Sequence, residues 1–540
     1  MPLYLGLDSS TQSLSAIVIE VDAGVRRVVF EDSLAFDQDF PEYGTEHGVL
    51  PGAEPSVAVS SPVLWAAALE AMMARVAAAV EVSRIAAISG SAQQHGSVYL
   101  NGSATARLGA LDPRRPLAEQ VQPMLSRPVS PIWMDSSTGV ECRAIAAAVG
   151  GDDTLAQHTG SRAFERFTGP QIRKFATHDP AAYARTERIH LVSSFLASLL
   201  AGRHAPIDPG DGSGMNLMDL ASTTWWDAAT TATAPGLRAK LPELAPASTI
   251  VGPLAAYWRE KHGFPAAQVI VWSGDNPCSL IGTGLVREGR LAVSLGTSDT
   301  VFGLMQEPRV DTTGTGHVFG SPTGAFMGLT CFKNGSLARE HVRDEFQLSW
   351  PEFSRILAST PAGNGGRVFL PWYEPEITPD VPTPGVHRYG LDPADRDGHV
   401  RAVIEAQMLS MAIHSAWMGV SVDTIHATGG AAANREILQV MADVFGAEVY
   451  QFEVANSASL GAALRAAQAD AQSRRAGVSW DEIVRGLADP ITASRITANP
   501  AAAPVYRKMK GIYAACEAHA LGRGPMPVTG ETALGNPART

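Results

Sequence analysis

The sequence predicts a two-domain α/β protein, and three of its features carry this prediction. The chain has 540 residues, well beyond the roughly 250 to 300 residues at which a single hydrophobic core stops growing. An apolar strand, a small polar turn and a second strand occur in residues 3–21 and again in residues 290–305. Such a repeat indicates two related domains. We place their boundary near residue 285, which gives domains of 1–285 and 286–540.

The third feature is an alternation of helices and strands between and after these strand pairs. Ser61 and Pro62 begin an apolar-periodic helix that runs to Val82, and residues 84–90 are typical of a buried strand. The other predicted elements are a helix over 140–149, a helix over 399–420, a strand over 424–428 and a helix over 434–445. Strands that alternate with helices imply α/β layers.

Two segments lack this periodicity. Residues 361–390 are rich in Pro and Gly, which predicts an ordered surface loop. Residues 522–540 have the same bias at the end of the chain, and we expect a frayed tail there.

Composition and charge exclude several classes of protein. Hydrophobic residues make up 45% and charged residues 18% of the chain, which is typical of a folded globular protein. The net charge is −12 and no basic run occurs, so no nucleic acid partner is expected. The four cysteines are far apart and have no metal-ligand spacing, which predicts a reducing compartment. Without a signal peptide or a membrane-length apolar stretch, we expect a cytoplasmic protein with no membrane partner.

The two repeated turns are candidate phosphate-binding sites. In the first turn, residues 8–12, Asp8 offers a carboxylate beside the hydroxyl groups of Ser9, Ser10 and Thr11. A hard cation such as Mg²⁺ prefers carboxylate oxygen, whereas phosphate oxygens need donors. The alternative is a polar turn that satisfies its own backbone. The second turn, residues 296–300, offers similar donors, so the pair is suited to hold a polyphosphate from two sides.

Asp275 follows a predicted strand over 268–273 and precedes Pro277, which suits the first turn of a helix. Its carboxylate is therefore expected at a strand-to-helix junction. It is a candidate helix N-cap and a candidate general base, and the two roles are compatible.

A further group of polar residues is typical of a site for a hydroxyl-rich ligand. The strand 84–90 continues into Gln93, Gln94 and His95, which places amides and an imidazole at a strand end. Residues 133–135 and 162–166 add aromatic, carboxylate and guanidinium groups. Taken singly, each of these residues is more often a structural histidine, a cap or a solvated ion pair.

Residues 428–436, with the sequence TGGAAANRE, form a strand end, a Gly-Gly pair and a helix start. Missing side chains at this point let a base or ribose lie against the backbone. The sequence contains no Walker motif and no GxGxxG in a dinucleotide-binding setting, so phosphate binding is assigned to the paired turns.

Taken in order, these segments resemble the FGGY family of carbohydrate kinases, and specifically its pentulose kinases of animal and fungal type. The resemblance covers nearly the whole chain and rests on LGLDSSTQS, SAQQHGS, PIWMDSST, GSRAFERFTG, DGSGMN, SGDNPCSL, VSLGTSDT, CFKNGSLARE and ATGGAAANREILQVMADVFGAEVY. It implies two RNase H-like domains, as in actin-like ATPases, that flank a deep cleft. It also implies a sugar-binding N-terminal domain, a nucleotide-binding C-terminal domain, and transfer of the γ-phosphoryl group of MgATP to the 5-hydroxyl of D-xylulose.

The resemblance also assigns roles to individual residues. For the sugar, it implies Asp275 as general base, hydroxyl contacts from Asn276, His95 and Arg166, and a pocket shaped by Gln94, Met134 and Asp135. For MgATP, it implies Asp8 and Thr11 at the magnesium ion and phosphates, Gly296, Thr297 and Ser298 at the phosphates, and Gly429, Gly430, Asn434 and Trp350 around the adenosine.

Three positions depart from the family pattern. Ser10 stands where the first turn commonly has glycine, and the second turn has Gly296 where the first has Asp8, so no metal is assigned there. The segment Ile172-Arg173-Lys174-Phe175 stands where bacterial members often have a Lys-x-x-Trp element. The alternatives are a kinase of the same family that acts on L-xylulose, ribulose or a polyol, and a non-catalytic nucleotide-responsive sugar-binding protein. The oligomeric state is not predicted.

Overall fold

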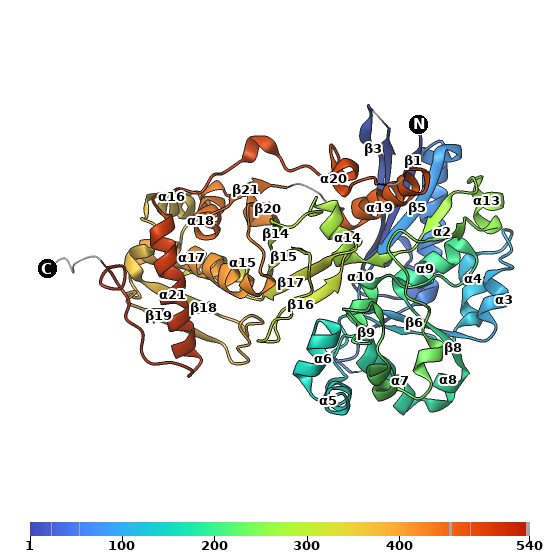
Figure 1. Cartoon of the computed structure of the whole chain (residues 1–540), viewed down its shortest axis with the longest axis horizontal. Coiled ribbons are helices and arrows are strands. Elements are labelled where there is room, and N and C mark those ends of the chain that lie inside the picture. Colours follow the sequence, from blue (N-terminus) through green and yellow to red (C-terminus); the bar gives the residue numbers. More distant parts are fainter. Residues whose placement is uncertain (23, 53, 453–455, 476, 536–540) are drawn as a thin grey trace.

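The computed structural model describes residues 1–540 except 23, 53, 453–455, 476 and 536–540 (Figure 1). Its N-terminal half is built on a seven-stranded sheet. The strand order is β11 (Ile250–Pro253), β12 (Gln268–Ile270), β5 (Ile85–Ala92), β1 (Leu3–Ser9), β2 (Ser13–Val21) and β3 (Arg26–Ala35), with β13 (Ser273–Gly274) also paired to β5. Strand β2 pairs antiparallel with β1 on one side and with β3 on the other. Strands β1, β12 and β13 each pair with β5 in parallel.

The C-terminal half repeats this topology in a six-stranded sheet. Its order is β16 (His317–Gly320), β17 (Phe326–Phe332), β15 (Asp299–Met305), β14 (Arg290–Leu295), β20 (Thr424–Thr428) and β21 (Glu448–Gln451). Strands β14, β15 and β17 form an antiparallel meander, and β20 and β21 continue the sheet in parallel from β14. The strand pairs predicted over 3–21 and 290–305 are therefore the first two strands of two sheets with the same connectivity.

Side chains of β1 point alternately into two cores, one on each face of the first sheet. Leu3, Leu5 and Leu7 point into a core that includes α2 (Pro62–Ala79) and α9 (Val192–Ala201), whereas Tyr4 belongs to a second core on the side of α19 (Ser457–Arg474). This is the period of two expected of a strand covered on both faces. Helix α2 is long and apolar enough to cross a membrane. Its residues Trp65, Leu69 and Met72 are fully buried in the first core, so we assign it as a core helix.

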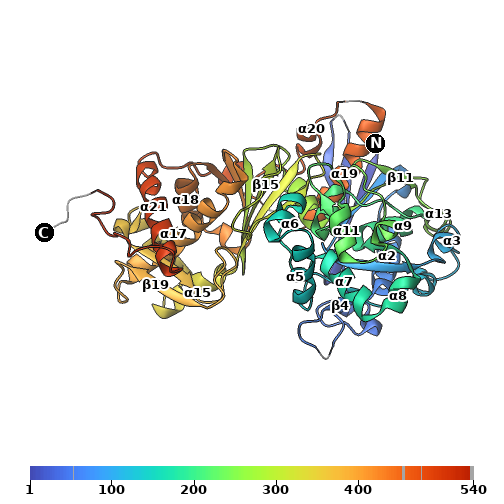
Figure 2. The same ribbon diagram turned by 60° about the horizontal axis from the view of Figure 1, so that its bottom comes forward.

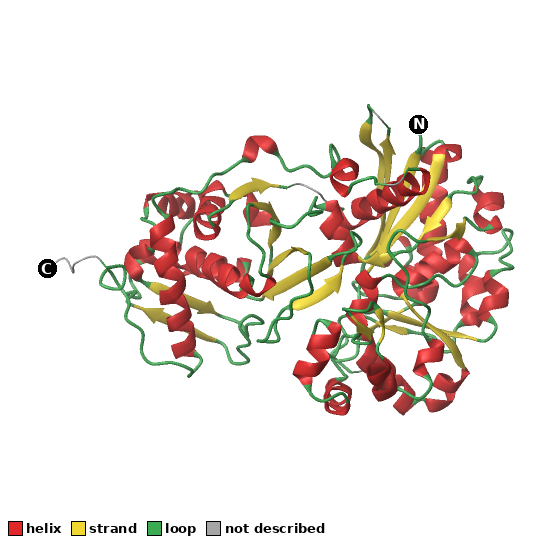
Figure 3. Ribbon diagram, viewed as in Figure 1, coloured by secondary structure: helices red, strands yellow, loops and turns green. Residues whose placement is uncertain are grey.

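The predicted helices lie close to their expected bounds. The helix expected from Pro62 to Val82 ends at Ala79 and is capped by the Ser61 hydroxyl, which accepts from Leu64 N. Those expected over 140–149, 399–420 and 434–445 are α5 (Gly139–Ala148), α17 (Arg396–His414) and α18 (Arg435–Phe445). Helices α17 and α18 pack with α15 (Ser336–Glu345), α16 (Trp350–Ser359) and α21 (Ala503–Ala520) in the core of the second half, whose helices and strands are distinguished by colour in Figure 3.

Smaller elements complete the N-terminal half, mostly below its sheet in Figure 1. Strands β6 (Ser97–Asn101) and β8 (Thr186–Leu191) pair with each other, as do β4 (Val59–Ser60) with β7 (Ser130–Pro131) and β9 (Met218–Asp219) with β10 (Thr224–Trp225). The helices are α1 (Phe36–Asp39), α3 (Ala104–Leu108), α4 (Leu117–Val121), α6 (Asp152–Thr159), α7 (Thr168–His178), α8 (Pro180–Arg185), α10 (Pro209–Gly212), α11 (Asp227–Thr233), α12 (Leu237–Lys240) and α13 (Ala256–His262).

The loop predicted over residues 361–390 is ordered but contains a strand pair. Strands β18 (Val368–Trp372) and β19 (Gly385–Tyr389) are antiparallel, and every residue of β18 is buried. The apolar run VFLPW packs against α17 and α21, and the surrounding Pro and Gly residues hid this strand from the compositional prediction.

The frayed tail expected over 522–540 is wrong for its described part. Residues 522–535 have no helix or strand, yet Leu534 packs against the core of the second half and Gly530 N donates to Gly366 O at 2.8 Å. Residues 536–540 lie outside the described part of the chain.

Two helices are exchanged between the halves. Helix α14 (Asp275–Gly282) precedes the second sheet, and its Leu280 packs into a cluster with Ala292, Leu304 and Met327 of that sheet. Helix α19 comes from the second half of the chain and packs against β1 and β5 of the first sheet, as both views in Figures 1 and 2 show. The boundary near residue 285 stays a prediction, but the chain crosses back to the first sheet after it.

Helices α14 and α19 touch through two glycines. A Cβ atom on Gly461 would lie 1.9 Å from Cys278 O, and one on Gly282 would lie 1.9 Å from Ser457 O. No side chain fits at either position, so the two backbones are in direct contact. Gly6 allows the same approach of α19 to β1, since its Cβ would lie 2.1 Å from Ser459 O.

We predict that Gly461→Ala forces α14 and α19 apart and lowers the free energy of unfolding by about 2 kcal/mol or more, as overpacking does. Thermal denaturation measures this effect. Gly511→Ala is the matched control, because Gly511 lies in α21 and an added Cβ there meets no atom within 4 Å. The control is expected to be neutral or to stabilise by about 0.5–1 kcal/mol. Equal melting of Gly461→Ala and the wild type would contradict this account of the helix contact.

Candidate active site

The first group of candidate residues lies where the parallel strands of the first sheet end. In the register of the sheet, Asp8 of β1 is opposite Ser91 of β5, and Ser91 is opposite Ser273 of β13. Asp275 follows two residues later, as the first residue of α14. Because carboxyl ends of parallel strands meet at one edge, Asp8 and Asp275 face the same region.

Asp275 is held by its neighbours but does not cap its own helix. The N-cap of α14 is Gly274, and no side chain caps this helix. Asp275 Oδ1 accepts from Asn276 N at 2.8 Å and from Asn276 Nδ2 at 3.1 Å. Asn276 Nδ2 also donates to Gln94 Oε1 at 2.9 Å, and Gln94 Nε2 donates to Gly210 O at 3.3 Å. Asp275, Asn276 and Gln94 therefore form one connected group of hydrogen bonds.

Burial makes the acids of this region reluctant to ionise. Burial, and secondly the charge of Asp8, raise the pKa of Asp275 to about 7. Burial raises the pKa of Asp8 to about 6, against the hydrogen bond that Ser91 Oγ donates to Asp8 Oδ1 at 2.6 Å. Burial also raises the pKa of Asp211, and the charges of Asp208 and Asp275 add to this effect. A carboxylate with a pKa near 7 has the proton affinity of an efficient general base.

His95 is neutral and fixed in one orientation. Its Nδ1 lies 2.7 Å from Gly214 O, which only accepts, so Nδ1 carries the proton and Nε2 is left as an acceptor. The ring stacks on Phe167 with a centroid distance of 4.4 Å. Burial, and secondly the charge of Arg166, lower the pKa of His95 to about 3. The residue has a positive φ of 72°, a conformation that is uncommon outside glycine and often found at functional sites.

Arg166 is not a solvated ion pair. Its guanidinium lies over the rings of Phe164 and Phe167, at 4.8 and 5.5 Å from their centroids, and it has no carboxylate partner among the described residues. Its Nη2 is 3.0 Å from Nε2 of His317, a residue of the second half. Arg162, by contrast, forms an exposed pair with Asp153.

Asp135 and Met134 are not brought into direct contact with this group. Asp135 is 2% exposed, and its carboxylate accepts from Ala58 N, Ser137 N and Oγ, and Gln171 Nε2. The carboxylate therefore ties the loop around Ser137 to Ala58 and to Gln171 of α7. Met134 is 47% exposed. The neighbouring Trp133 donates from Nε1 to Thr11 Oγ1 at 2.7 Å and so ties this loop to the first turn.

A cavity of about 830 Å³ lies in the second half beside the second turn. Five predicted residues line it, namely Gly296, Thr297, Trp350, Gly430 and Asn434. Ser298 and Gly429 do not line it. Gly429 has a φ of 85°, and a Cβ there would lie 2.5 Å from Leu295 O, so glycine is needed where β14 and the Gly-Gly turn meet. The volume lies within the range of small-molecule sites.

Asn434 and Trp350 shape this cavity in different ways. Asn434 Oδ1 accepts from Glu436 N and Ile437 N and so caps α18, while its Nδ2 donates to Ser354 Oγ at 2.7 Å. Trp350 is the first residue of α16, 40% exposed, with the guanidinium of Arg343 at 4.8 Å from its ring. A flat, half-exposed indole beside a helix N-terminus suits a planar base and an anionic group.

The second turn rests on a buried ion pair. Arg339 of α15 contacts both carboxylate oxygens of Asp299, at 3.0 and 3.2 Å, and both side chains are at most 1% exposed. Arg339 Nη2 also donates to Gly296 O at 3.2 Å. Asp299 is thus committed to the protein, which agrees with assigning no metal to this turn.

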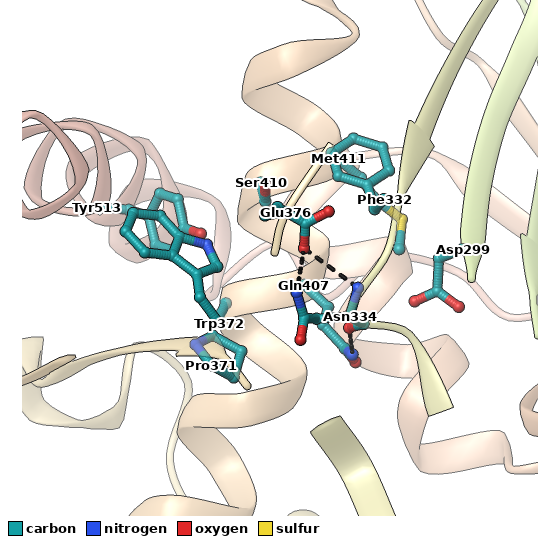
Figure 4. Close-up of a pocket in the computed structure, with 11 residues that line it drawn as sticks. Asp299, Phe332, Asn334, Pro371, Trp372, Glu376, Gln407, Ser410, Met411 and Tyr513 are labelled. Carbon is teal, nitrogen blue, oxygen red and sulfur yellow. Dashed lines mark hydrogen bonds between the residues drawn. The ribbon is translucent and has the colours of Figure 1, made fainter. Parts of the chain in front are cut away.

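The ion pair continues into a polar network below it. Arg339 Nη1 donates to Gln407 Oε1, and Gln407 Nε2 donates to Asn334 O and Gly335 O, each at 2.8 Å. Glu376 accepts from Asn334 Nδ2 at 2.8 Å and from the backbone of Lys333 and Asn334. Figure 4 shows Asn334, Glu376 and Gln407 of this network, with Asp299, around a cavity of about 20 Å³, which has room for one water molecule.

Sequence reasoning missed Trp133, Arg339 and His317. Trp133 was part of a noted motif, but nothing local shows that its indole reaches Thr11. Arg339 is hydrogen-bonded to Asp299, 40 positions away along the chain. His317 is hydrogen-bonded to Arg166, 151 positions away. Arg339 lies in the polar segment SLAREHVRDE, so nothing around it in the sequence indicates that it is buried.

Comparison with known proteins identifies the family. Residues 123–282 match the N-terminal domain, and residues 291–469 the C-terminal domain, of the FGGY family of carbohydrate kinases. The chain is 43% identical over 538 residues to xylulose kinase of Rattus norvegicus, covering 97% of this chain and 98% of that protein. The chain belongs to the FGGY family. It is similar to xylulose kinase 2 of Arabidopsis thaliana as well, at 43% identity over 86% of this chain and 87% of that one.

Solved kinase structures show the same fold. A xylulose kinase from Rhodospirillum rubrum superposes with a TM-score of 0.78 at 21% identity, covering 96% of this chain and 99% of that one. A glycerol kinase from Plasmodium falciparum with ADP gives 0.77 at 15% identity, covering 98% and 99%. The predicted fold class, two RNase H-like domains of the actin-like ATPase type, is therefore confirmed. As an FGGY kinase, the chain is an enzyme whose small-molecule substrates are ATP and a sugar.

We predict that Arg339→Leu leaves Asp299 as an unpaired buried carboxylate and destabilises the fold by about 3–5 kcal/mol. The variant Asp299→Asn/Arg339→Leu removes both charges, so part of this stability is expected to return. The Michaelis constant for ATP stays raised in both, because Gly296 has lost its support. Thermal denaturation and steady-state kinetics measure the two effects. Arg355→Leu, at an arginine that is 74% exposed, is the control. A normal ATP constant in the double variant would refute the supporting role.

Proposed function

We propose that this FGGY kinase phosphorylates D-xylulose at its 5-hydroxyl with ATP, and that Asp275 is the general base. One observation carries the proposal: a carboxylate with a pKa of about 7 lies at a helix N-terminus, hydrogen-bonded to Asn276 and connected to Gln94. The relatives named xylulose kinase support the choice of sugar.

In the proposed reaction, Asp275 accepts the proton of the sugar hydroxyl as that oxygen attacks the γ-phosphorus. The O–H bond breaks, a new O–P bond forms, and the bond between the γ-phosphorus and the bridging oxygen breaks, which releases ADP. Phosphoryl transfer mainly requires in-line positioning and charge neutralisation. Asn276, neutral His95 and Arg166 are suited to orient the sugar, since together they offer donors and an acceptor.

Asp8 fits a magnesium ion. Its Oδ1 accepts from Ser91, and its Oδ2 has no hydrogen-bond partner in the described part of the chain. A free carboxylate oxygen beside a phosphate-binding turn is the usual protein ligand of Mg²⁺ in a kinase. Asp8 would hold the ion of MgATP, and the ion would neutralise phosphate charge.

An ADP-release assay across D-xylulose, L-xylulose, ribulose, aldopentoses and polyols tests the choice of substrate. We expect the highest kcat/KM for D-xylulose. A polyol or another ketopentose with a higher value would replace D-xylulose and leave the kinase assignment intact.

Replacing the base tests the mechanism. Asp275→Asn keeps the shape of the side chain but removes its charge and basicity, so we expect kcat to fall by roughly 100-fold to 10,000-fold. Calorimetry is expected to show retained binding of sugar and ATP. Asp397→Asn, at an exposed carboxylate paired with Arg396, is the control. Near-normal turnover of Asp275→Asn would rule out the base.

The raised pKa of Asp275 predicts a pH dependence. The base works only when deprotonated, so its active fraction falls as the pH drops below about 7. We expect log kcat/KM for the sugar to decline on the acid side with a slope of one. A bound cation at Asp8 lowers the midpoint, because it cancels the like charge that contributes to the shift. A rate that stays flat down to pH 4 would contradict the proposed base.

A further inference from the structure

His317 comes from the second half of the chain but lies against the first. It begins β16, the edge strand of the second sheet, and is 4% exposed. Two residues that follow it are hydrogen-bonded to the first half: Val318 N donates to Gly160 O, and Gly320 N donates to Ser213 Oγ, each at 3.0 Å. In Figure 1, β16 lies beside α10 of the first half. This strand therefore fixes the imidazole at the junction.

The hydrogen bonds of His317 determine its tautomer. Arg166 Nη2 is 3.0 Å from Nε2, and because a guanidinium only donates, Nε2 must accept. The proton of the neutral ring is therefore on Nδ1, which donates to Ser161 Oγ at 3.1 Å. Ser161, His317 and Arg166 form a chain with one consistent direction. Burial, and secondly the charges of Arg166 and His95, lower the pKa of His317 well below its usual range, in keeping with the neutral ring.

Arg166 has few other side chains to hold it. Two phenylalanine rings, Phe164 and Phe167, cover its guanidinium, and His317 is its one side-chain hydrogen-bond acceptor among the described residues. Phe164 also packs edge-on against the His317 ring at 4.8 Å. A charged group that is largely removed from water needs such an acceptor to keep a single orientation.

We propose that His317 is a positioning residue for sugar binding: it fixes Arg166 so that the remaining donors of the guanidinium face the sugar. The second half of the chain thereby contributes to the affinity of the first half for its substrate. This inference rests on the proposed role of Arg166 as a sugar ligand.

Two conservative variants separate the hydrogen bonds of His317. The amide of Asn superposes on the Nδ1 position, so His317→Asn keeps a donor to Ser161 but does not reach Arg166. Gln is longer, and its Oε1 replaces Nε2 as the acceptor. Loss of one charge-assisted hydrogen bond predicts that His317→Asn raises the Michaelis constant and dissociation constant for the sugar roughly 10-fold. We expect His317→Gln to recover most of this loss, with kcat and the ATP constant little changed in both.

Ser161→Ala tests the same chain of hydrogen bonds, from Ser161 through His317 to Arg166, without altering the imidazole. It removes the acceptor that fixes the tautomer, so a smaller rise in the sugar constant is expected. His426→Asn is the matched control, because His426 is also buried, with Nδ1 at 2.7 Å from Thr283 O, but lies outside the proposed site. Its sugar constant is expected to be that of the wild type.

A double-mutant cycle distinguishes this inference from the proposed function. We expect Arg166→Met to weaken sugar binding, and His317→Asn to add little in that background, because both remove the same interaction. An unchanged sugar constant in Arg166→Met would refute Arg166 as a ligand. Two outcomes would show that His317 is not a positioning residue. One is that Arg166→Met weakens sugar binding but the losses of sugar affinity in Arg166→Met and His317→Asn add fully. The other is that His317→Gln binds the sugar as weakly as His317→Asn.

Discussion

The direct backbone contact between α14 and α19 is the constraint on which the rest of the structure depends. Gly282 and Gly461 allow the contact, and each helix packs against the sheet of the opposite half. Asp275 is the first residue of α14, so its position is set by packing against both halves at once. Leu280 packs against the second sheet. The next residue, Ile281, belongs to the core between the first sheet and α19. A carboxylate carried by such a helix is positioned by a rigid element and not by a loop.

Buried polar groups make the two turns differ in the charge that they present. In the first turn, Asp8 keeps one carboxylate oxygen free, whereas in the second, Asp299 is neutralised by Arg339. The halves share a topology, yet among the described residues the first turn presents a carboxylate oxygen without a hydrogen-bond partner, whereas the second presents backbone and a cavity. Burial, and secondly the charge of Asp8, raise the pKa of Asp275, which suits a group that accepts a proton at neutral pH.

Sequence reasoning predicted what depends on local pattern. The repeated strand pairs, the bounds of most helices and the position of Asp275 follow from periodicity, caps and turn residues within a few positions. Strand β18 was missed because Pro and Gly flank a short apolar run. The return of α19 to the first sheet, the ion pair of Arg339 and the contact of His317 with Arg166 each join distant parts of the chain. Residues far apart in sequence carry no local signal of their partner: Asp135, for example, accepts from Ala58 N and Gln171 Nε2, which lie 77 and 36 positions away along the chain.

The central claim is that a ketopentose hydroxyl meets the γ-phosphate of ATP at Asp275. A crystal structure with D-xylulose and a non-hydrolysable ATP analogue tests this most directly. The account predicts the 5-hydroxyl oxygen within hydrogen-bonding distance of an Asp275 carboxylate oxygen, roughly 2.6–3.2 Å, and the γ-phosphorus on the far side of that oxygen from the carboxylate. A sugar bound with every hydroxyl beyond the reach of Asp275, even through one water molecule, would contradict it.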